Sequence, residues 1–238
     1  TIGASLRLQV KEKVKPVIAL VTPTNGARVT NNKQPITFKV TDETNGSGVK
    51  TSTVSLKIDG NTFNESSTGM TKTAITNGYQ FVYTPQTALS NGDHTITINA
   101  QDNDGNAAAV VTASIKVDTV PPSLNITSPA NGLITNTKSI TLEGTTNDAT
   151  SSPVTVTAKL NGTDVGSITV TNGAFSKALT GAEGNNTLVV TARDAAGLTT
   201  PVTINFKIDT SVPKIKNVSI SPNPADASGS VAIELEIE

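Results

Sequence analysis

The chain has 238 residues and a formal net charge of −1 at pH 7, with 18 Lys and Arg against 19 Asp and Glu. Binding to nucleic acid or another polyanion needs clustered basic side chains, so the balanced charge argues against such partners. The absence of Cys excludes disulfides, thiolate metal sites and cysteine nucleophiles. No apolar run approaches the ~20 residues of a membrane-spanning helix, so no membrane span is predicted.

The densest basic cluster comes first. Lys11, Lys13 and Lys15 alternate with Glu12 and Val14, a pattern that predicts the solvated edge of a β-strand. The stretch ASLRLQVKEKVKP that contains them resembles ASIKVDTVPP further along the chain. Residues 1–15 are therefore expected to be the last strand of a preceding domain.

The following segments alternate apolar and polar residues between turn signals. Ile36, Phe38 and Val40 share one face of a predicted strand, and the same period of two recurs over residues 54–58, 96–100 and 115–117. Such alternation is typical of antiparallel strands with one buried face. Asn-Gly pairs between the segments supply the positive φ that tight turns need. Essentially no helix is expected.

The sequence then repeats itself. PVIALVTPTNGARVTNNKQPITFKVTD begins at Pro16, and PSLNITSPANGLITNTKSITLEGTTND begins 106 positions later at Pro122. The next equivalent proline, Pro213, follows after 91 positions, and the extra length of the first copy falls in residues 43–53 and 64–73. About a hundred residues with about seven strands per copy is the size of an immunoglobulin-like sandwich.

The predicted fold is all-β, with tandem immunoglobulin-like antiparallel β-sandwich domains in an extended array. Stiff proline junctions separate the domains. The expected boundaries are residues 1–15 for the last strand of one domain, 16–120 and 121–211 for two whole domains, and 212–238 for the first strands of a further, truncated one.

The linkers VDTVPP and IDTSVP, the P-x-N-G turns, and the segments ITINAQDNDGN and LVVTARDAAGL resemble the bacterial Ig-like repeats of large surface adhesins and of other cell-envelope or phage-tail proteins. One junction departs from the pattern, because KEKVKP before Pro16 lacks the Asp of the linker. The resemblance implies an extracellular, cell-surface or virion-surface location, with neighbouring Ig-like domains of the same chain as partners.

Three functions remain open. The leading hypothesis is a non-catalytic structural stalk or spacer of a secreted or surface-exposed fibre or adhesin. The second is an adhesive module that binds a host or cell-surface glycan or protein through residues 43–53 and 64–73. The third is an accessory region of a secreted polysaccharide-degrading enzyme. The chain lacks the G-x-S-x-G and G-x-x-x-x-G-K-[ST] motifs and has a single His. We therefore expect no enzyme and no required cofactor.

Acidic residues near the second junction offer a candidate calcium site. In a seven-strand sandwich, the loop before the last strand lies at the same end as the N-terminus and the loop between the second and third strands. This topology brings Asp194 near Asp148 and near the linker residue Asp118. Carboxylate oxygens are the ligands that Ca²⁺ prefers, and the resemblance implies interdomain calcium in some related repeats. In the alternative interpretation, these Asp side chains only accept hydrogen bonds from turn N–H groups.

The first domain offers a second candidate calcium site. Asp102 and Asp104 lie in the segment Asp-Asn-Asp-Gly-Asn, and Asp42 with Glu43 lies on the facing loop. The segment resembles part of an EF-hand loop but lacks its terminal Glu and its flanking helices. A glycine-containing hairpin is the alternative interpretation.

Two further features have a structural and a functional interpretation. Tyr79, Phe81 and Tyr83 alternate on one predicted strand. They are expected to be core residues, and a carbohydrate-stacking stripe is the alternative. His94 stands between Asp93 and Thr95 at a predicted strand start and is expected to be a surface residue.

Overall fold

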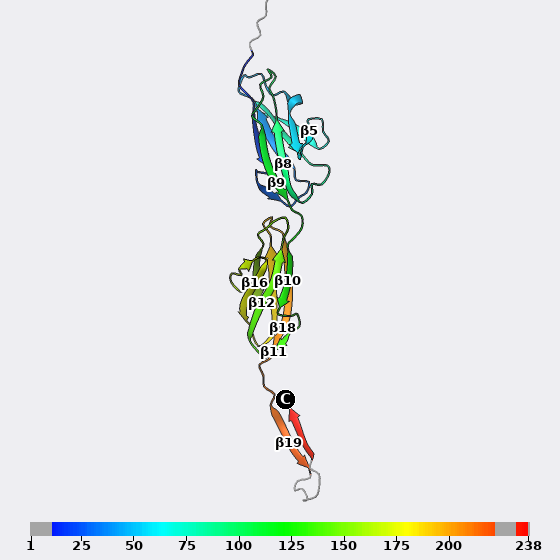
Figure 1. The fold of residues 1–238 in the computed structure, drawn as a ribbon, viewed down its shortest axis with the longest axis vertical. Helices are drawn as coiled ribbons and strands as arrows, with labels where there is room; N and C mark the ends of the chain where they lie inside the picture. The colour runs from blue at the N-terminus through cyan, green and yellow to red at the C-terminus, as the bar shows by residue number, and fades with distance from the viewer. Residues whose placement is uncertain (1–10, 222–231, 238) are drawn as a thin grey trace, which may run out of the picture. The chain divides into compact units, whose positions relative to one another are not determined.

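The computed structural model describes residues 11–221 and 232–237, and it divides into two compact units (Figure 1). The first unit holds the described residues up to Ser123 together with the loops Asn147–Val154 and Arg193–Thr200. The second unit holds Leu124–Thr146, Thr155–Ala192 and the described residues from Pro201 onward.

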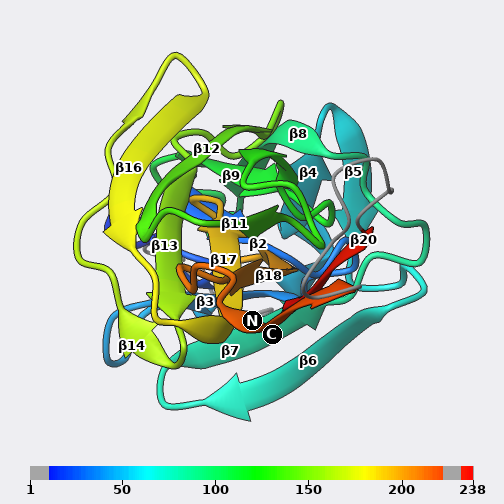
Figure 2. The same cartoon turned by 90° about the horizontal axis from the view of Figure 1, so that it is seen from below.

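The first sandwich has two sheets. Its four-stranded sheet runs in the order β1 (Val17–Thr22), β3 (Ile36–Thr41), β7 (Gly78–Tyr83) and β6 (Met70–Ile75). The five-stranded sheet runs in the order β2 (Ala27–Val29), β9 (Val111–Val117), β8 (Gly92–Asn99), β4 (Ser55–Ile58) and β5 (Asn61–Asn64). Figure 2 shows β6 beside β7 at the edge of the first of these sheets.

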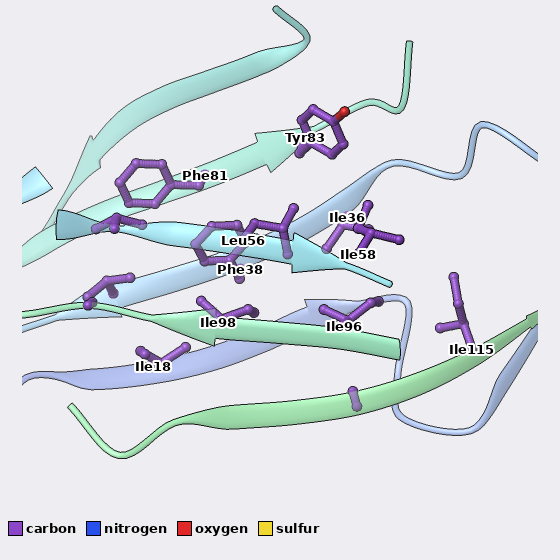
Figure 3. Packing of buried hydrophobic residues seen from close by; sticks show 14 of the residues in the cluster. Ile18, Ile36, Phe38, Leu56, Ile58, Phe81, Tyr83, Ile96, Ile98 and Ile115 are labelled. Carbon is purple, nitrogen blue, oxygen red and sulfur yellow. The ribbon is translucent and has the colours of Figure 1, made fainter. Parts of the chain in front are cut away.

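The core of the first sandwich follows from the alternation in the sequence. Ile36, Phe38 and Val40 are fully buried, and the polar residues between them are half-buried. Figure 3 shows the apolar side chains of the two sheets meeting between the layers. Phe38 pairs with Phe81 in the register of β3 and β7, and their rings stack with centroids 5.2 Å apart.

The same pair of hydrogen bonds explains why both copies contain a P-x-N-G turn. In the first, Asn25 Oδ1 accepts a hydrogen bond from the Ser114 N–H (2.8 Å), and Gly26 N–H donates to the Ser114 carbonyl (2.7 Å). Gly26 has a φ of +79°, which favours glycine. Asn131 and Gly132 make the same pair of bonds to Asn205. Each turn thus attaches the start of a copy to its last strand, beside the parallel pairs β2–β9 and β11–β18.

The second sandwich repeats the order of the first. One sheet contains β10 (Ser123–Ser128), β12 (Ser139–Asn147), β16 (Ala174–Thr180) and β15 (Val170–Thr171). The other contains β11 (Ile134–Thr135), β18 (Thr199–Ile208), β17 (Gly184–Arg193), β13 (Thr155–Leu160) and β14 (Thr163–Asp164). After β18 in the chain, β19 (Ile215–Ser221) and β20 (Ala232–Ile237) form an antiparallel pair.

The predicted all-β fold with two Ig-like sandwiches in tandem is confirmed. The described residues contain no α-helix, only a single 3₁₀ turn, η1 (Thr51–Thr53). Within them, no helix has the length and apolar character to cross a membrane. The domain boundaries stay predictions, and residues 1–10 of the first predicted segment lie outside the described part.

The predicted strand edge around Lys11–Lys15 is wrong. Residues 11–16 form no strand, and Glu12 is half-buried while its lysine neighbours Lys11 and Lys13 are exposed. The reason is a set of polar contacts: the Glu12 N–H donates to Asp104 Oδ2 (2.9 Å), and Ser47 Oγ donates to Glu12 Oε1 (3.2 Å). These contacts turn Glu12 toward the first sandwich.

Candidate functional site

Asp118, Asp148 and Asp194 come together in the first unit. Asp118 directly follows β9, Asp148 follows β12 and Asp194 follows β17. Each offers one carboxylate oxygen, and these three oxygens lie within 4.8 Å of one another. The three residues are 0%, 6% and 5% exposed, respectively. The topological argument from the sequence thus placed these side chains correctly, far apart as they are along the chain.

One oxygen of each carboxylate bonds to the backbone of its own turn. Asp118 Oδ1 accepts from Val120, Asp148 Oδ1 from Thr150 and Ser151, and Asp194 Oδ1 from Ala196 and Leu198, at 2.5–3.1 Å. The interpretation that these residues only accept hydrogen bonds from turn N–H groups therefore explains one of the two oxygens of each carboxylate. It leaves the other oxygens of Asp118 and Asp194 unexplained.

The second oxygens of Asp118 and Asp194 are the evidence for a bound ligand. Asp118 Oδ2 and Asp194 Oδ2 are buried and have no hydrogen-bond partner, and neither has the hydroxyl of the fully buried Ser151. Two carboxylates this close repel each other by about 3 kcal/mol even at an effective dielectric constant of ~20. A buried unpaired charge is costly unless a cation or a proton compensates it. Hard oxygen ligands without sulfur or nitrogen suit Ca²⁺, so the residues present fit the ion.

A second carboxylate cluster lies elsewhere in the first unit. Glu12, Asp42 and Asp102 each place one carboxylate oxygen within 4.8 Å of the others. The structure thus brings together Asp42 and Asp102 of the predicted set, but the third member is Glu12. Asp104 instead accepts the Glu12 backbone N–H through Oδ2.

The sequence analysis missed Glu12 because three lysines surround it. A usable signal was nevertheless present: Glu12 stands four residues before Pro16, as Asp118 stands four residues before Pro122. The departure noted in KEKVKP is therefore a substitution of Glu for Asp at the same position. Its longer side chain keeps the carboxylate.

The electrostatics of this second cluster reflect crowded acidic groups. The hydrogen bond between the Glu43 and Glu12 carboxyls, with further contributions from burial and from Asp42, raises the pKa of Glu43 to about 7. Burial alone would raise the pKa of Asp102, but hydrogen bonds from Asn106 outweigh it and hold that pKa below its usual value. One proton or one cation satisfies such a group of carboxylates.

The other singled-out residues are mostly structural. Phe81 and Tyr83 are 0% and 3% exposed, which confirms them as core, while Tyr79 is half-buried beneath the Lys72 ammonium. The expectation that His94 is a surface residue is wrong, because it is only 5% exposed. It lies on the inward face of β8, on the same side as Ile96.

The two long segments of the first domain are also placed. Residues 43–53 lie beside the second cluster, where the Gly48 N–H donates to Asp42 Oδ2 (2.7 Å). Residues 64–73 include the end of β5 and the start of β6. An open cavity of about 940 Å³ lies next to this second segment, lined in part by Phe63, Thr68 and His94. Neither segment contains an aromatic residue, and the nearby Tyr83 is buried against Phe63.

Comparison with known proteins gives matches for both sandwiches. Residues 16–98 match the family described as bacterial Ig domain, and residues 122–210 match the family described as glucodextranase, domain B. No curated protein matches the chain.

Several solved structures are similar to the chain. The fibronectin(III)-like modules of CbhA from Clostridium thermocellum are 16% identical, with 81% of this chain and 94% of that chain covered and a TM-score of 0.45. Latent PorU from Porphyromonas gingivalis is 19% identical, with 84% and 21% covered and a TM-score of 0.38. The Ig1-2 module of the Drosophila receptor tyrosine phosphatase DLAR is 13% identical, with 82% and 98% covered and a TM-score of 0.32.

At such low identity and TM-scores, these likenesses to solved structures carry no conclusion about activity. The family matches and the repeated strand order agree with each other. The chain is a tandem of bacterial Ig-like β-sandwich domains, the second of which resembles domain B of glucodextranase.

Proposed function

We propose that the chain is a non-catalytic spacer of a secreted or surface-exposed multidomain protein, and that Asp118, Asp148 and Asp194 bind a calcium ion within it. The single observation that supports cation binding is that two buried carboxylate oxygens, Asp118 Oδ2 and Asp194 Oδ2, have no hydrogen-bond partner. A bound ion ties the segment after β9 to the loops after β12 and β17, so that three segments move as one. Length and stiffness are what a spacer supplies.

Support for a non-catalytic role comes from the hydrogen bonds of His94. The one His is bonded through both ring nitrogens, to Asp59 and to the Ser90 carbonyl. It is therefore not available as a general base. Activity assays on α-glucans with the purified chain are expected to show no hydrolysis, and any turnover above a buffer blank contradicts the proposal.

Calorimetric titration of the metal-free chain with calcium chloride tests the cation. Asp118→Asn keeps the side-chain volume and removes one ligand charge, and we expect it to abolish one equivalent of calcium binding. Asp209→Asn is the matched control, because Asp209 holds the same linker position in IDTSVP, is half-exposed, and is paired with Lys207. Equal binding by the parent and Asp118→Asn would rule out this site.

A second candidate function is an accessory region of a secreted polysaccharide-degrading enzyme. The match of residues 122–210 to glucodextranase domain B favours it over a role in adhesion. Affinity electrophoresis in gels containing dextran separates an accessory region from a spacer. Retarded migration relative to a gel without polysaccharide supports the accessory role, and unchanged migration supports a spacer.

Adhesion would require residues 43–53 and 64–73 to bind a glycan or a receptor. The cavity lined by Phe63, Thr68 and His94 is the feature that would serve this binding. A glycan array probed with the full chain tests it directly, with Thr68→Trp as a variant that fills the cavity. Binding that this variant removes would establish an adhesive role.

A further inference from the structure

The chain contains seven Asn-Gly pairs, all within its described residues. In such a pair the glycine backbone nitrogen can attack Cγ of the asparagine side chain, because glycine has no Cβ to obstruct the approach. An N–Cγ bond forms, the Cγ–Nδ2 bond breaks, and ammonia departs from a succinimide ring. Water then opens the ring at either carbonyl, which gives aspartate or isoaspartate. The attack requires the two atoms to approach within about 3–3.5 Å, so the fold decides which pair reacts.

Four of the seven asparagines have side chains that other parts of the fold hold in place. Asn25 Oδ1, Asn91 Oδ1 and Asn131 Oδ1 each accept a backbone N–H at 2.8–3.0 Å, and Asn77 Nδ2 donates to Thr44 Oγ1 at 2.9 Å. Each of these amides must break a hydrogen bond before it can turn toward its own main chain. These four pairs are therefore protected.

Asn161 and Asn172 provide a matched comparison. Each occupies the first position of a two-residue turn, Asn161 between β13 and β14 and Asn172 between β15 and β16. The φ angles are +50° and +51° for the asparagines, and +82° and +78° for the glycines that follow them, as in type I′ turns. Both asparagines are exposed, so neither backbone geometry nor access of water distinguishes the two pairs.

The side-chain contacts of the two asparagines differ. Asn161 Oδ1 accepts a hydrogen bond from the Thr187 N–H (2.8 Å), and its Nδ2 donates to Asn186 Oδ1 (2.9 Å). The Asn172 side chain has no hydrogen-bond partner in the described part of the chain. Its amide can therefore rotate toward the Gly173 nitrogen without losing a contact.

The turn that contains Asn172 also lies in a short hairpin. β15 is the outermost strand of its sheet and pairs with β16 only through Val170 and Thr171. Val170 is half-buried and Thr171 is exposed. Edge segments with few buried contacts open at a lower free energy than the core of a sandwich. Such opening allows the backbone to reach the geometry of attack.

Asn45 forms the remaining pair, and its side chain also lacks a partner among the residues that the structure describes. Acidic groups surround its glycine: a Cβ atom at Gly46 would lie 2.8 Å from Asp42 Oδ2 and 2.8 Å from Glu43 Oε1. The Gly46 N–H also donates to the Glu43 carbonyl (3.2 Å). The attacking nitrogen must lose its proton, and nearby carboxylates disfavour the resulting anion. This pair should therefore react more slowly than Asn172.

We propose that Asn172 is a site of spontaneous deamidation in the folded chain, converted to isoaspartate and aspartate before any other Asn-Gly pair. Both products add a negative charge to the turn. Isoaspartate also places its Cβ in the main chain, so the two-residue turn no longer fits the register of β15 and β16. Release of β15 leaves the edge of β16 open to another strand. The site shares no residue with the Asp118 cluster and does not depend on the proposed spacer function.

Peptide mapping by mass spectrometry tests the proposal on the folded full chain, aged in mildly alkaline buffer made with heavy-oxygen water. The peptide with Asn172 should gain one heavy oxygen and become a substrate for isoaspartyl-specific methylation. We expect its conversion to be about tenfold or more faster than that of Asn161, because two hydrogen bonds must first break at Asn161. Asn172→Gln, which would have to form a larger ring, should stay unconverted and leave the other pairs unchanged.

Ageing in concentrated urea is the control for the intrinsic reactivity of each pair. Without the fold, the rates at Asn161 and Asn172 should converge, which would show that side-chain contacts cause the difference. Equal rates at these two positions in the folded chain would overturn the inference. Earlier conversion of any other pair, or an Asn172 that stays intact when folded but reacts in urea, would overturn it as well.

Discussion

Nδ1 of His94, which is buried in the first sandwich, lies 2.6 Å from Oδ2 of Asp59, whose side chain is 43% exposed. The other ring nitrogen, Nε2, lies 2.7 Å from the Ser90 carbonyl, which can only accept a hydrogen bond. Both hydrogen bonds can form at the same time with an ionised carboxylate only when both ring nitrogens carry a proton, so this geometry favours the imidazolium form of His94. In the second sandwich the corresponding residues are Asn161 and Asn186, joined by a neutral hydrogen bond of 2.9 Å.

The pair of Asp59 and His94 predicts a pH-dependent stability of the first sandwich. Burial alone lowers the pKa of His94, but its hydrogen bonds to Asp59 and Ser90 outweigh this and raise it above the usual 6.5. The stabilisation is therefore complete below pH 6.5 and is lost as the pH rises through the folded-state pKa. On the acid side, burial alone would raise the pKa of Asp59. Its hydrogen bonds, first of all the one to His94, outweigh burial and lower this pKa below 3.8. Stability from this carboxyl is lost as the pH falls through that lower value.

The measurement can use tyrosine fluorescence during thermal unfolding. Both tyrosines of the chain lie in β7, so their signal reports the first sandwich alone. Unfolding midpoints should fall as the pH is raised from about 6 to about 9. The double variant Asp59→Asn with His94→Asn copies the second sandwich and should lose this slope. A slope that persists in the double variant would show that other groups cause it.

Much of the fold could be predicted from the sequence because period-two alternation records which face is buried. Ile36, Phe38 and Val40 alternate visibly, and all three are fully buried. His94 was missed although it continues the inward series of Ile96 and Ile98. Its polar neighbours predict a surface position, whereas in the fold Asp59 supplies a partner for the buried ring. A buried ionisable residue depends on such a partner, which lies far away in the sequence.

The acidic residues of the two clusters also differ in how far the sequence predicts their positions. Asp148 and Asp194 could be brought together from the topology of a sandwich alone, since that topology fixes which loops share an end. For Glu12 the only signal is its position four residues before Pro16, because its inward direction results from contacts with Ser47 and Asp104 that the alternation of residues does not encode. The sequence therefore predicts the loops that hold the carboxylates but not every residue of the two clusters.

The stacked pair Phe38 and Phe81 should dominate the stability of the first sandwich. Both rings are fully buried, and Phe38→Ala removes the stacking and leaves a cavity between the sheets. We expect a loss of about 3–5 kcal/mol in the free energy of unfolding, measured by denaturant titration with tyrosine fluorescence. Val110→Ala, at an exposed position, serves as control. A loss below about 1 kcal/mol for Phe38→Ala would mean that the core refills the space.

In the second sandwich, Gly144 occupies the position of Phe38 and pairs with Phe175. A Cβ atom at Gly144 would lie 2.5 Å from the Asn125 carbonyl and 2.6 Å from Phe175 Cζ. Gly144→Ala should therefore lower the free energy of unfolding of this sandwich by about 1–3 kcal/mol, because the ring cannot move far in a packed core. Differential scanning calorimetry measures it, with the exposed neighbour Glu143→Ala as control. Equal stability of the two variants would contradict the packing argument.

Removal of one charge from the Asp118 cluster should have opposite effects with and without calcium. In buffer containing a chelator, Asp118→Asn relieves repulsion among three buried carboxylates and is expected to stabilise the chain by about 1–3 kcal/mol. In excess calcium, the same variant loses a ligand and the binding free energy that raises the unfolding temperature of the parent. Thermal unfolding of both proteins under both conditions should therefore show the order of stability inverted. A purely structural Asp118, needed only for the Val120 N–H, would make the variant less stable under both conditions, because the turn would lose its charged acceptor whether or not an ion is present.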